Sequence, residues 1–164
     1  MILFIASTQD TAGMNITNQL IANHNFKKTE EIFQDNPVYT KTLHNKQTKL
    51  IFVNSEIVNT QFLENHFNPD LYIFLSRHSS RQGIPTLSVH TPGNLSEAKF
   101  GGKAKIVSVS SAAAMKNALK EMSKLATQQN LDYEVSYECT HHGPSLDTPA
   151  MFVELGSSSE QWKD

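Results

Sequence analysis

The sequence contains a single cysteine and lacks any long hydrophobic run. One cysteine, Cys139, excludes an internal disulfide framework and is typical of a reducing compartment such as the cytoplasm. No apolar run approaches the roughly 18 residues that a membrane-spanning helix requires, which excludes an integral membrane protein. The apolar stretch at residues 2–6 has no basic residues before it, so it predicts a buried strand instead of a signal peptide. We expect a cytoplasmic protein that is not attached to a membrane.

Several common site motifs are also absent. The chain has no Walker A loop, no Rossmann glycine fingerprint and no Gly-x-Ser-x-Gly elbow, which excludes these nucleotide-binding and nucleophile sites. Neither sign of charge dominates, since 14 Lys and Arg stand against 16 Asp and Glu, for a net charge of −2 and a pI near 6.4. This balance argues against a general polyanion binder but is compatible with a local basic patch.

Short apolar runs alternate with helical patterns along the chain. Runs rich in β-branched or aromatic residues predict strands at residues 2–6, 38–43, 50–54, 71–75, 86–89, 104–109, 132–139 and 151–155. Apolar spacing predicts helices at 14–24, 60–67 and 112–129, the last with Ala114, Ala118, Met122 and Leu125 on one side. This alternation predicts a single α/β domain over residues 1–156, with a mixed, mostly parallel sheet flanked by helices. The run 71–75 is expected to be covered on both faces of the sheet.

The last residues, 157–164, are expected to form a tail or the start of an unfinished helix. Ser157 and Glu160 have the Ser-x-x-Glu spacing of a capping box, which opens helices. Only four residues follow Glu160, fewer than a stable helix needs.

Histidines gather at the ends of predicted strands. Four of the seven, each just beyond a predicted strand, are His78, His90, His141 and His142. Ligands of α/β sheets lie outside the carboxyl ends of the strands, so we expect these histidines to converge. Imidazole serves as a metal ligand or as a general base near neutral pH. The alternative is a set of hydrogen-bonding loop histidines that only shape the pocket.

The only two arginines, Arg77 and Arg81, flank His78. An arginine fork binds phosphate or carboxylate through two parallel hydrogen bonds, and the hydroxyl of Ser79 lies in the same loop. This segment therefore predicts an anion site, the alternative being an exposed loop with ordinary surface charge. Lys103, beside two glycines, adds positive charge of the kind that an RNA backbone requires.

Other polar residues have simpler interpretations. Lys116, Lys120 and Lys124 share one helix face, which is more typical of a solvated surface than of a nucleic-acid contact. Cys139, at a predicted strand end, is expected to be a small buried apolar residue instead of a nucleophile. The carboxylates nearest to strand ends are Asp10, Glu138 and Glu154, and each is a candidate to ligate a metal or to orient a histidine.

Four ordered blocks of sequence resemble one known family. They are Phe74-Leu75-Ser76-Arg77-His78-Ser79-Ser80, Val89-His90-Thr91-Pro92-Gly93-Asn94, Thr140-His141-His142-Gly143-Pro144 and Pro149-Ala150-Met151-Phe152-Val153-Glu154-Leu155-Gly156-Ser157-Ser158. Together with Ser7-Thr8-Gln9-Asp10, they resemble the archaeal and plant type of D-aminoacyl-tRNA deacylase. The resemblance implies a zinc-dependent hydrolase with a phosphorylase- and peptidyl-tRNA hydrolase-like α/β fold. Such an enzyme cleaves the ester between a D-amino acid and the 3′ end of tRNA, in translation quality control.

The resemblance also implies roles for individual residues. Ester hydrolysis needs an activated water and stabilisation of an oxyanion. Catalytic roles are expected for His78, His141 and His142, and the same histidines together with Glu154 are the candidate zinc ligands. Contacts to the tRNA acceptor end are expected from Arg77, Ser79, Arg81, His90, Lys103 and Thr140. No stable protein partner is implied, and which histidine binds metal and which acts as the base stays open.

Two other functions stay open as well. The resemblance implies that family members continue past this C-terminus with another glycine-rich, histidine-bearing segment. The chain is therefore expected to be a natural short member or a fragment with an incomplete site. One alternative function follows from this, that of a tRNA-binding fragment or paralogue without catalysis. The other, from fold analogy alone, is a peptidyl-tRNA hydrolase or a nucleoside phosphorylase-like enzyme, which would need no zinc.

Overall fold

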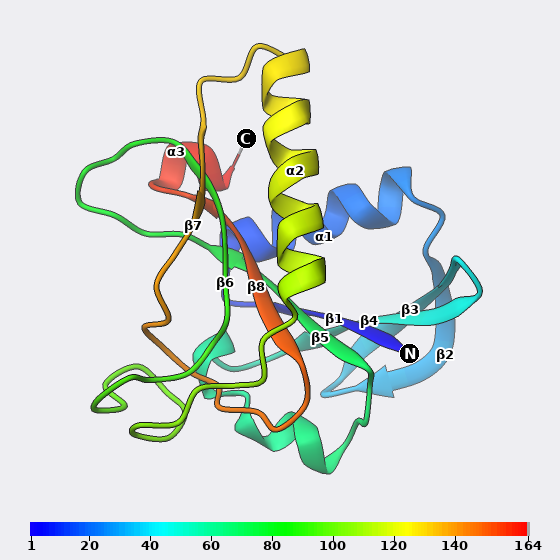
Figure 1. Ribbon diagram of the computed structural model, residues 1–164. Helices are drawn as coiled ribbons and strands as arrows, with labels where there is room; N and C mark the ends of the chain where they lie inside the picture. Colours follow the sequence, from blue (N-terminus) through cyan, green and yellow to red (C-terminus); the bar gives the residue numbers. More distant parts are fainter. Residues whose placement is uncertain (164) are drawn as a thin grey trace.

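One mixed sheet organises the described part of the chain, residues 1–163 of this computed structural model (Figure 1). Its eight strands are β1 (Ile2–Ser7), β2 (Lys27–Phe33), β3 (Asn36–Leu43), β4 (Lys46–Val53), β5 (Leu71–Arg77), β6 (Thr86–His90), β7 (Glu134–Tyr137) and β8 (Ala150–Gly156). The α-helices of this part are α1 (Thr11–Asn23), α2 (Ala112–Gln128) and α3 (Ser159–Trp162), and its 3-10 helices are η1 (Ile57–Asn59) and η2 (Gln61–Asn65).

The strand order β2-β3-β4-β1-β5-β8-β6-β7 combines two strand directions. Strands β4, β1, β5 and β8 run parallel to one another, whereas β3 is antiparallel to both β2 and β4. At the other end, β6 is antiparallel to β8 and β7 is parallel to β6. The predicted class, an α/β fold with a mixed, mostly parallel sheet, is confirmed. Among the described residues, no helix is long and apolar enough to cross a bilayer.

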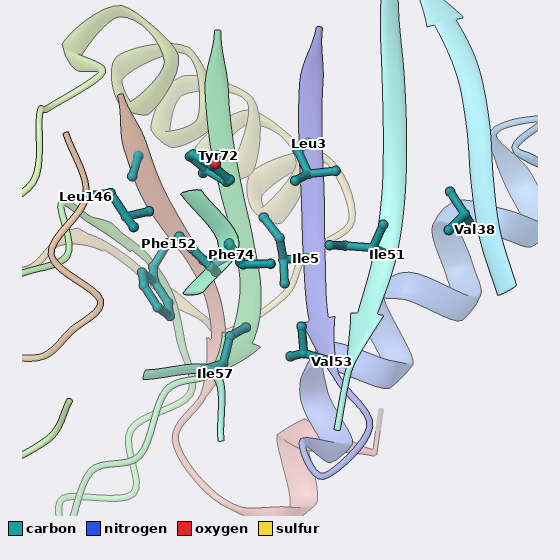
Figure 2. Close-up of a cluster of buried hydrophobic side chains, with 12 residues drawn as sticks. Leu3, Ile5, Val38, Ile51, Val53, Ile57, Tyr72, Phe74, Leu146 and Phe152 are labelled. Atoms are coloured by element: carbon teal, nitrogen blue, oxygen red, sulfur yellow. The ribbon is translucent and has the colours of Figure 1, made fainter. Parts of the chain in front are cut away.

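Apolar side chains alternate between the two faces of the sheet. Leu3, Ile5, Tyr72 and Phe74 point to one face, where Figure 2 shows them beside side chains of neighbouring strands and η1 and η2 contribute further apolar residues. Leu75 belongs to the opposite face, which packs against α1. The predicted burial of 71–75 on both faces is therefore confirmed, since adjacent residues of β5 enter different parts of the core.

Helix α2 covers the β6 and β8 end of the sheet (Figure 1). Met115, Leu119 and Met122 pack toward Val89 of β6 and Met151 of β8, together with the alanines predicted on that side. Leu125, predicted on the same side, is 46% exposed instead. The buried stripe continues to Ala126, so Leu125 lies beside it.

Several predicted elements need correction. Strand β2 escapes the sequence prediction because most of its side chains are exposed, so it has no apolar face. The strand predicted at 104–109 does not form; Lys105 has a φ of 57°, and Val107 makes only an isolated bridge to Gly93. The helix predicted at 60–67 is replaced by η1 and η2, and the strand predicted at 132–139 shortens to β7. Cys139 therefore lies beyond the strand and is exposed, not buried.

The C-terminal segment forms the short helix that its capping signal predicts, shifted by one residue. Ser158, not Ser157, is the N-cap, and its hydroxyl accepts a hydrogen bond from the Glu160 backbone. Gln161, not Glu160, reaches back to the N-cap backbone and completes the capping box.

Candidate functional site

Glu154 lies at the centre of the candidate site. It sits in the middle of β8, between Ser76 of β5 and Ser88 of β6 in the sheet register. Its side chain is 3% exposed, and Ser76 Oγ donates a hydrogen bond to its Oε1 at 2.7 Å. A buried carboxylate is costly unless it is paired and hydrogen-bonded, so the partners of Glu154 determine what the site can do.

Histidines surround this carboxylate. Nδ1 of His78 lies 3.6 Å from Oε2, and the Nε2 atoms of His90 and His142 lie 3.6 and 3.8 Å from Oε1. The ring centroid of His141 is 4.8 Å from that of His90 and 4.4 Å from that of His142. The structure therefore brings together the four histidines that the sequence predicts to converge.

These histidines converge for a reason that differs from the predicted one. Strand β5 delivers His78 at its carboxyl end, as expected. Strands β6 and β7 run against β5 and β8, so they arrive from the opposite end of the sheet. His90 ends β6 opposite Phe152, and the loop after β7 places His142 against the same phenylalanine. The carboxyl-edge rule thus accounts for His78 alone.

Backbone carbonyls fix the orientation of the imidazoles that come from β6 and the loop after β7. The Nδ1 atoms of His90, His141 and His142 lie 3.2, 2.8 and 2.9 Å from backbone carbonyl oxygens one or two residues away in the sequence. An Nδ1–H group donates to each carbonyl, which leaves Nε2 as the nitrogen available for a proton or a metal. The buried Nε2 of His90 has no hydrogen-bond partner among the described residues.

Glu138 holds His78 as a cation. Its Oε1 lies 3.0 Å from His78 Nδ1, so it orients this histidine as the sequence suggested. Pairing with Glu138 and Glu154 outweighs burial and raises the pKa of His78 to about 10. Burial raises the pKa of Glu138, but the pairing with His78 lowers it below its usual value overall. The imidazolium of His78 is suited to donate a hydrogen bond to a developing negative charge.

The adjacent histidines His141 and His142 differ in charge. Burial lowers the pKa of His141, so its ring is neutral at neutral pH. Burial also disfavours charge on His142, but the pairing with Glu154 outweighs burial and raises its pKa. Burial alone would raise the pKa of Glu154, yet the adjacent rings of His142, His78 and His90 hold it well below the usual value. A neutral imidazole therefore stands beside an ion-paired cluster.

A cleft of about 330 Å³ opens onto this cluster. Its lining includes His78, His141, His142 and Glu154, and also Arg77, Ser79 and Phe100. This volume lies at the lower end of the range for small-molecule sites, so the cleft can hold a small organic group.

The predicted anion-binding residues are only partly brought to the cleft. Arg77 and Ser79 line it, and the Arg77 guanidinium also lies 3.6 Å from Glu56 and over the ring of Trp162. Arg81 and Lys103 are exposed and lie outside the lining. They belong to the surface around the site, not to its wall.

Three other predicted residues have structural positions. His90, a predicted substrate contact, is fully buried and does not line the cleft. Thr140, another predicted substrate contact, does not line the cleft, and its Oγ1 donates to the Thr91 carbonyl at 2.9 Å, which fixes the segment before His141. Asp10 caps α1, since its Oδ1 accepts from Gly13 N at 3.0 Å, and its Oδ2 accepts from Arg77 N at 3.0 Å. Asp10 therefore fixes the start of the segment from Arg77 to Arg81, the arginine loop.

Phe100 escapes the sequence analysis. It lines the cleft although its side chain is 65% exposed. No periodicity marks it, because its segment has no regular structure. The one available signal is a bulky aromatic residue placed directly before Gly101 and Gly102.

Two groups of side chains offer donor atoms at separations that suit a metal. One ring nitrogen of each of His90, His141 and His142 lies within 4.8 Å of the others. His78, Glu138 and Glu154 form the second group, also within 4.8 Å. The first group fits zinc better, because its Nδ1 atoms already face carbonyls whereas the ring of His78 is an imidazolium.

Comparison with known proteins agrees with the resemblance. The family model described as D-aminoacyl-tRNA deacylase matches residues 65–164. The D-aminoacyl-tRNA deacylase of Pyrococcus horikoshii is 39% identical over 99% of this chain and 59% of its own length. That of Methanosarcina acetivorans is 37% identical over 99% of this chain and 57% of its own length. The chain therefore spans about three fifths of the length of these relatives.

Solved structures share the fold. The crystal structure of a conserved protein of unknown function matches with a TM-score of 0.86 and 29% identity, over 100% of this chain and 57% of that one. The Helicobacter pylori 5′-methylthioadenosine/S-adenosyl homocysteine nucleosidase matches with a TM-score of 0.55 and 13% identity, over 94% of this chain and 84% of that one. The latter likeness shows the fold alone and agrees with the predicted phosphorylase-like architecture. On the family model and the curated relatives together, the chain belongs to the D-aminoacyl-tRNA deacylase family.

Proposed function

We propose that the protein hydrolyses the ester bond of D-aminoacyl-tRNA. Water attacks the ester carbonyl carbon, the bond from this carbon to the ribose oxygen breaks, and the ribose oxygen leaves with a proton. The products are a free D-amino acid and tRNA, so the reaction removes wrongly charged tRNA from translation. It belongs in the cytoplasm and needs no protein partner.

The observation that carries this proposal is the neutral imidazole of His141 beside the buried Glu154 cluster. His141 lines the cleft, and the Cys139 carbonyl lies 2.8 Å from its Nδ1, so Nε2 is the nitrogen that can accept a proton. A histidine in this state can take the proton of an attacking water and return it to the leaving ribose oxygen. We assign His141 as the general base.

The neighbouring cation supports the second requirement of ester hydrolysis. Charge develops on the carbonyl oxygen as water attacks, and a fixed donor stabilises it best where bulk water is excluded. His78 lines the same cleft and is held as an imidazolium by Glu138 and Glu154. We assign His78 to the oxyanion, not to a metal.

Zinc is the cofactor that we propose, held by two histidines of the first group, His90 and His142, and by Glu154, so that His141 of that group stays free to act as the base. This set revises the candidates named from the sequence, since it replaces His78 and His141 with His90. Both Nε2 atoms approach the same oxygen of Glu154, at 3.6 and 3.8 Å. Bonds of about 2.0–2.2 Å to one tetrahedral ion place ligand atoms roughly 3.3–3.6 Å apart, so these residues fit with small adjustments. Zinc bound there would polarise the ester carbonyl and lower the pKa of a water molecule.

The remaining predicted residues contact the nucleic acid in this proposal. Arg77 and Ser79 line the cleft and would bind the phosphate nearest to the ester. Arg81 and Lys103 are exposed outside it and would contact phosphates of the acceptor end at longer range.

The test is hydrolysis of matched D- and L-aminoacyl-tRNA by the protein, with and without a chelator. We expect cleavage of the D-ester only, lost with the chelator and restored by added zinc. Cleavage that survives chelation would remove zinc from the proposal and leave His141 acting alone. Salt-sensitive tRNA binding without cleavage would favour the alternative of a tRNA-binding paralogue or fragment.

A further inference from the structure

We infer that Phe100 is a stacking platform for the unpaired base at the 3′ end of the RNA substrate. The inference rests on the proposed function for the identity of the RNA. Its starting observation is that Phe100 is 65% exposed and yet lines the cleft together with His141 and His142. An aromatic ring exposed at the wall of a cleft offers a flat apolar face that a ligand in the cleft can cover.

The backbone holds Phe100 at a fixed place beside the histidines. Gly143 N–H donates a hydrogen bond to the Phe100 carbonyl at 2.9 Å, and Gly93 N–H donates to the His142 carbonyl at 2.6 Å. The segment around Phe100 (the Phe100 segment) and the loop after β7 that carries His141 and His142 (the histidine loop) are therefore hydrogen-bonded to each other, one residue away from His142. A base on the Phe100 ring would keep a defined distance from the catalytic groups.

Glycines make this close approach possible. Gly101 and Gly102 have φ values of 70° and 76°, in the left-handed region. A Cβ on Gly101 would collide with the Val58 carbonyl, and one on Gly102 would lie 2.8 Å from Ser145 Oγ. The residues after Phe100 are thus wedged between η1 and the histidine loop. Such a preformed platform loses little conformational entropy when a ligand binds.

The chemistry around Phe100 suits a single-stranded nucleic acid. Residues 95–105 carry three lysines, Lys99, Lys103 and Lys105, and one acidic residue, Glu97. Aromatic rings beside basic side chains hold unpaired nucleotides, with the base on the ring and the phosphate near the cations. The scissile ester is on the ribose of the terminal nucleotide, so the base of that nucleotide must lie beside the cleft. Phe100 occupies that position, and a flat base covers it better than a branched aminoacyl side chain would.

Binding of short RNA tests this inference without any need for catalysis. The probes are the labelled trinucleotide CCA and the same RNA with an abasic 3′ residue, measured by fluorescence anisotropy. We expect the protein to bind CCA about 5- to 150-fold more tightly than the abasic RNA, the range that one base–aromatic stack provides. Phe100→Leu should abolish this preference without weakening the abasic complex or lowering Tm, and Phe100→Trp should keep it.

Leu95→Ala is the matched control, since Leu95 has the same 65% exposure in the same segment but does not line the cleft. The inference fails if Phe100→Leu retains the preference, if Leu95→Ala loses it equally, or if the wild-type protein has none. Hydrolysis of D-aminoacyl-tRNA is measured in parallel. Cleavage without a base preference overturns the inference alone, whereas a base preference without cleavage overturns the proposed hydrolysis alone.

Discussion

Oε1 of Glu138 lies 3.0 Å from Nδ1 of His78, so a carboxylate that follows β7 holds a ring that follows β5. The two residues come from strands that run in opposite directions, and their pairing joins the two halves of the site. The Glu138 side chain is only 19% exposed, and its pKa nevertheless stays low because His78 compensates its charge. We regard Glu138 as a positioning residue for His78.

Glu138→Gln should reduce kcat about 10- to 100-fold with little change in KM, because the amide cannot hold His78 as a cation in the same way. Steady-state kinetics on D-aminoacyl-tRNA measure both constants. Glu134→Gln, an exposed carboxylate on β7, is the control and should behave as wild type. A rise in KM at constant kcat would instead place Glu138 in substrate binding.

Replacing Arg77 and Arg81 together with Gln should raise KM and flatten its dependence on salt. For each phosphate that the variant no longer neutralises, the slope of log KM against log salt should fall by about 0.7 to 0.9. The variant with both Lys116→Gln and Lys120→Gln, which removes two exposed cations of α2, serves as the control for net charge. If the slope of the arginine double variant equals that of the control, the arginine loop does not bind phosphate.

Gly143→Ala should destabilise the fold and impair the site. A Cβ at this position would collide with the backbone of Gly101 and Gly102, so the histidine loop and the Phe100 segment would have to separate. We expect a loss of about 1–3 kcal/mol in the free energy of unfolding, measured by urea denaturation. Gly83→Ala is the control, because its φ of 67° is also positive but no atom of the described residues lies within 4 Å of the added Cβ. Equal losses in the two variants would mean that the loops are not in close contact.

Tyr72 makes stability depend on pH in the alkaline range. Its ring is fully buried, and Oη donates to the Phe67 carbonyl at 2.8 Å. Burial, with the charge of Glu64, raises the pKa of Tyr72 from 10.0 to about 12. Between these values the folded chain keeps a proton that the unfolded chain loses. Rising pH therefore favours the unfolded chain, and the free energy of unfolding falls. The contribution is complete below pH 10 and is lost as pH rises toward 12.

The expected slope from this one group is about 1.4 kcal/mol per pH unit within that window. Urea denaturation of the wild type and of Tyr72→Phe above pH 10 isolates it, since the variant lacks the titrating hydroxyl. The wild type should lose stability more steeply with pH than the variant. Parallel curves would show that the Tyr72 phenol is not buried as described.

The sequence predicts the parts of the fold that depend on continuous burial. The run 71–75 is recognisable as a strand because adjacent residues such as Phe74 and Leu75 enter different faces of the core. Strand β2 is not recognisable, because it is an edge strand whose pairing to β3 uses backbone atoms while most of its side chains stay in water. Residues 104–109 mislead for the opposite reason, since apolar residues such as Ile106 and Val107 remain exposed in an irregular segment.

The candidate site is predictable in its membership but not in its arrangement. Chain order places His78, His90, His141 and His142 after strands, yet the direction of β6 and β7 decides where they meet. Glu154 carries a local signal, because a charged residue interrupts an apolar run in the buried strand β8. The exclusion of His90 from the cleft and the presence of Phe100 in it depend on long-range contacts, which no local pattern encodes.

The most direct measurement is single-turnover hydrolysis of D-aminoacyl-tRNA by His141→Ala and His142→Ala, with His24→Ala as the control. His24 is exposed and ends α1 away from the cleft lining. Loss of the general base in His141→Ala, or of a proposed zinc ligand in His142→Ala, should slow cleavage by about 100-fold or more. His24→Ala should cleave at the wild-type rate. Wild-type rates in all three variants would contradict the assignment of catalysis to the histidines around Glu154.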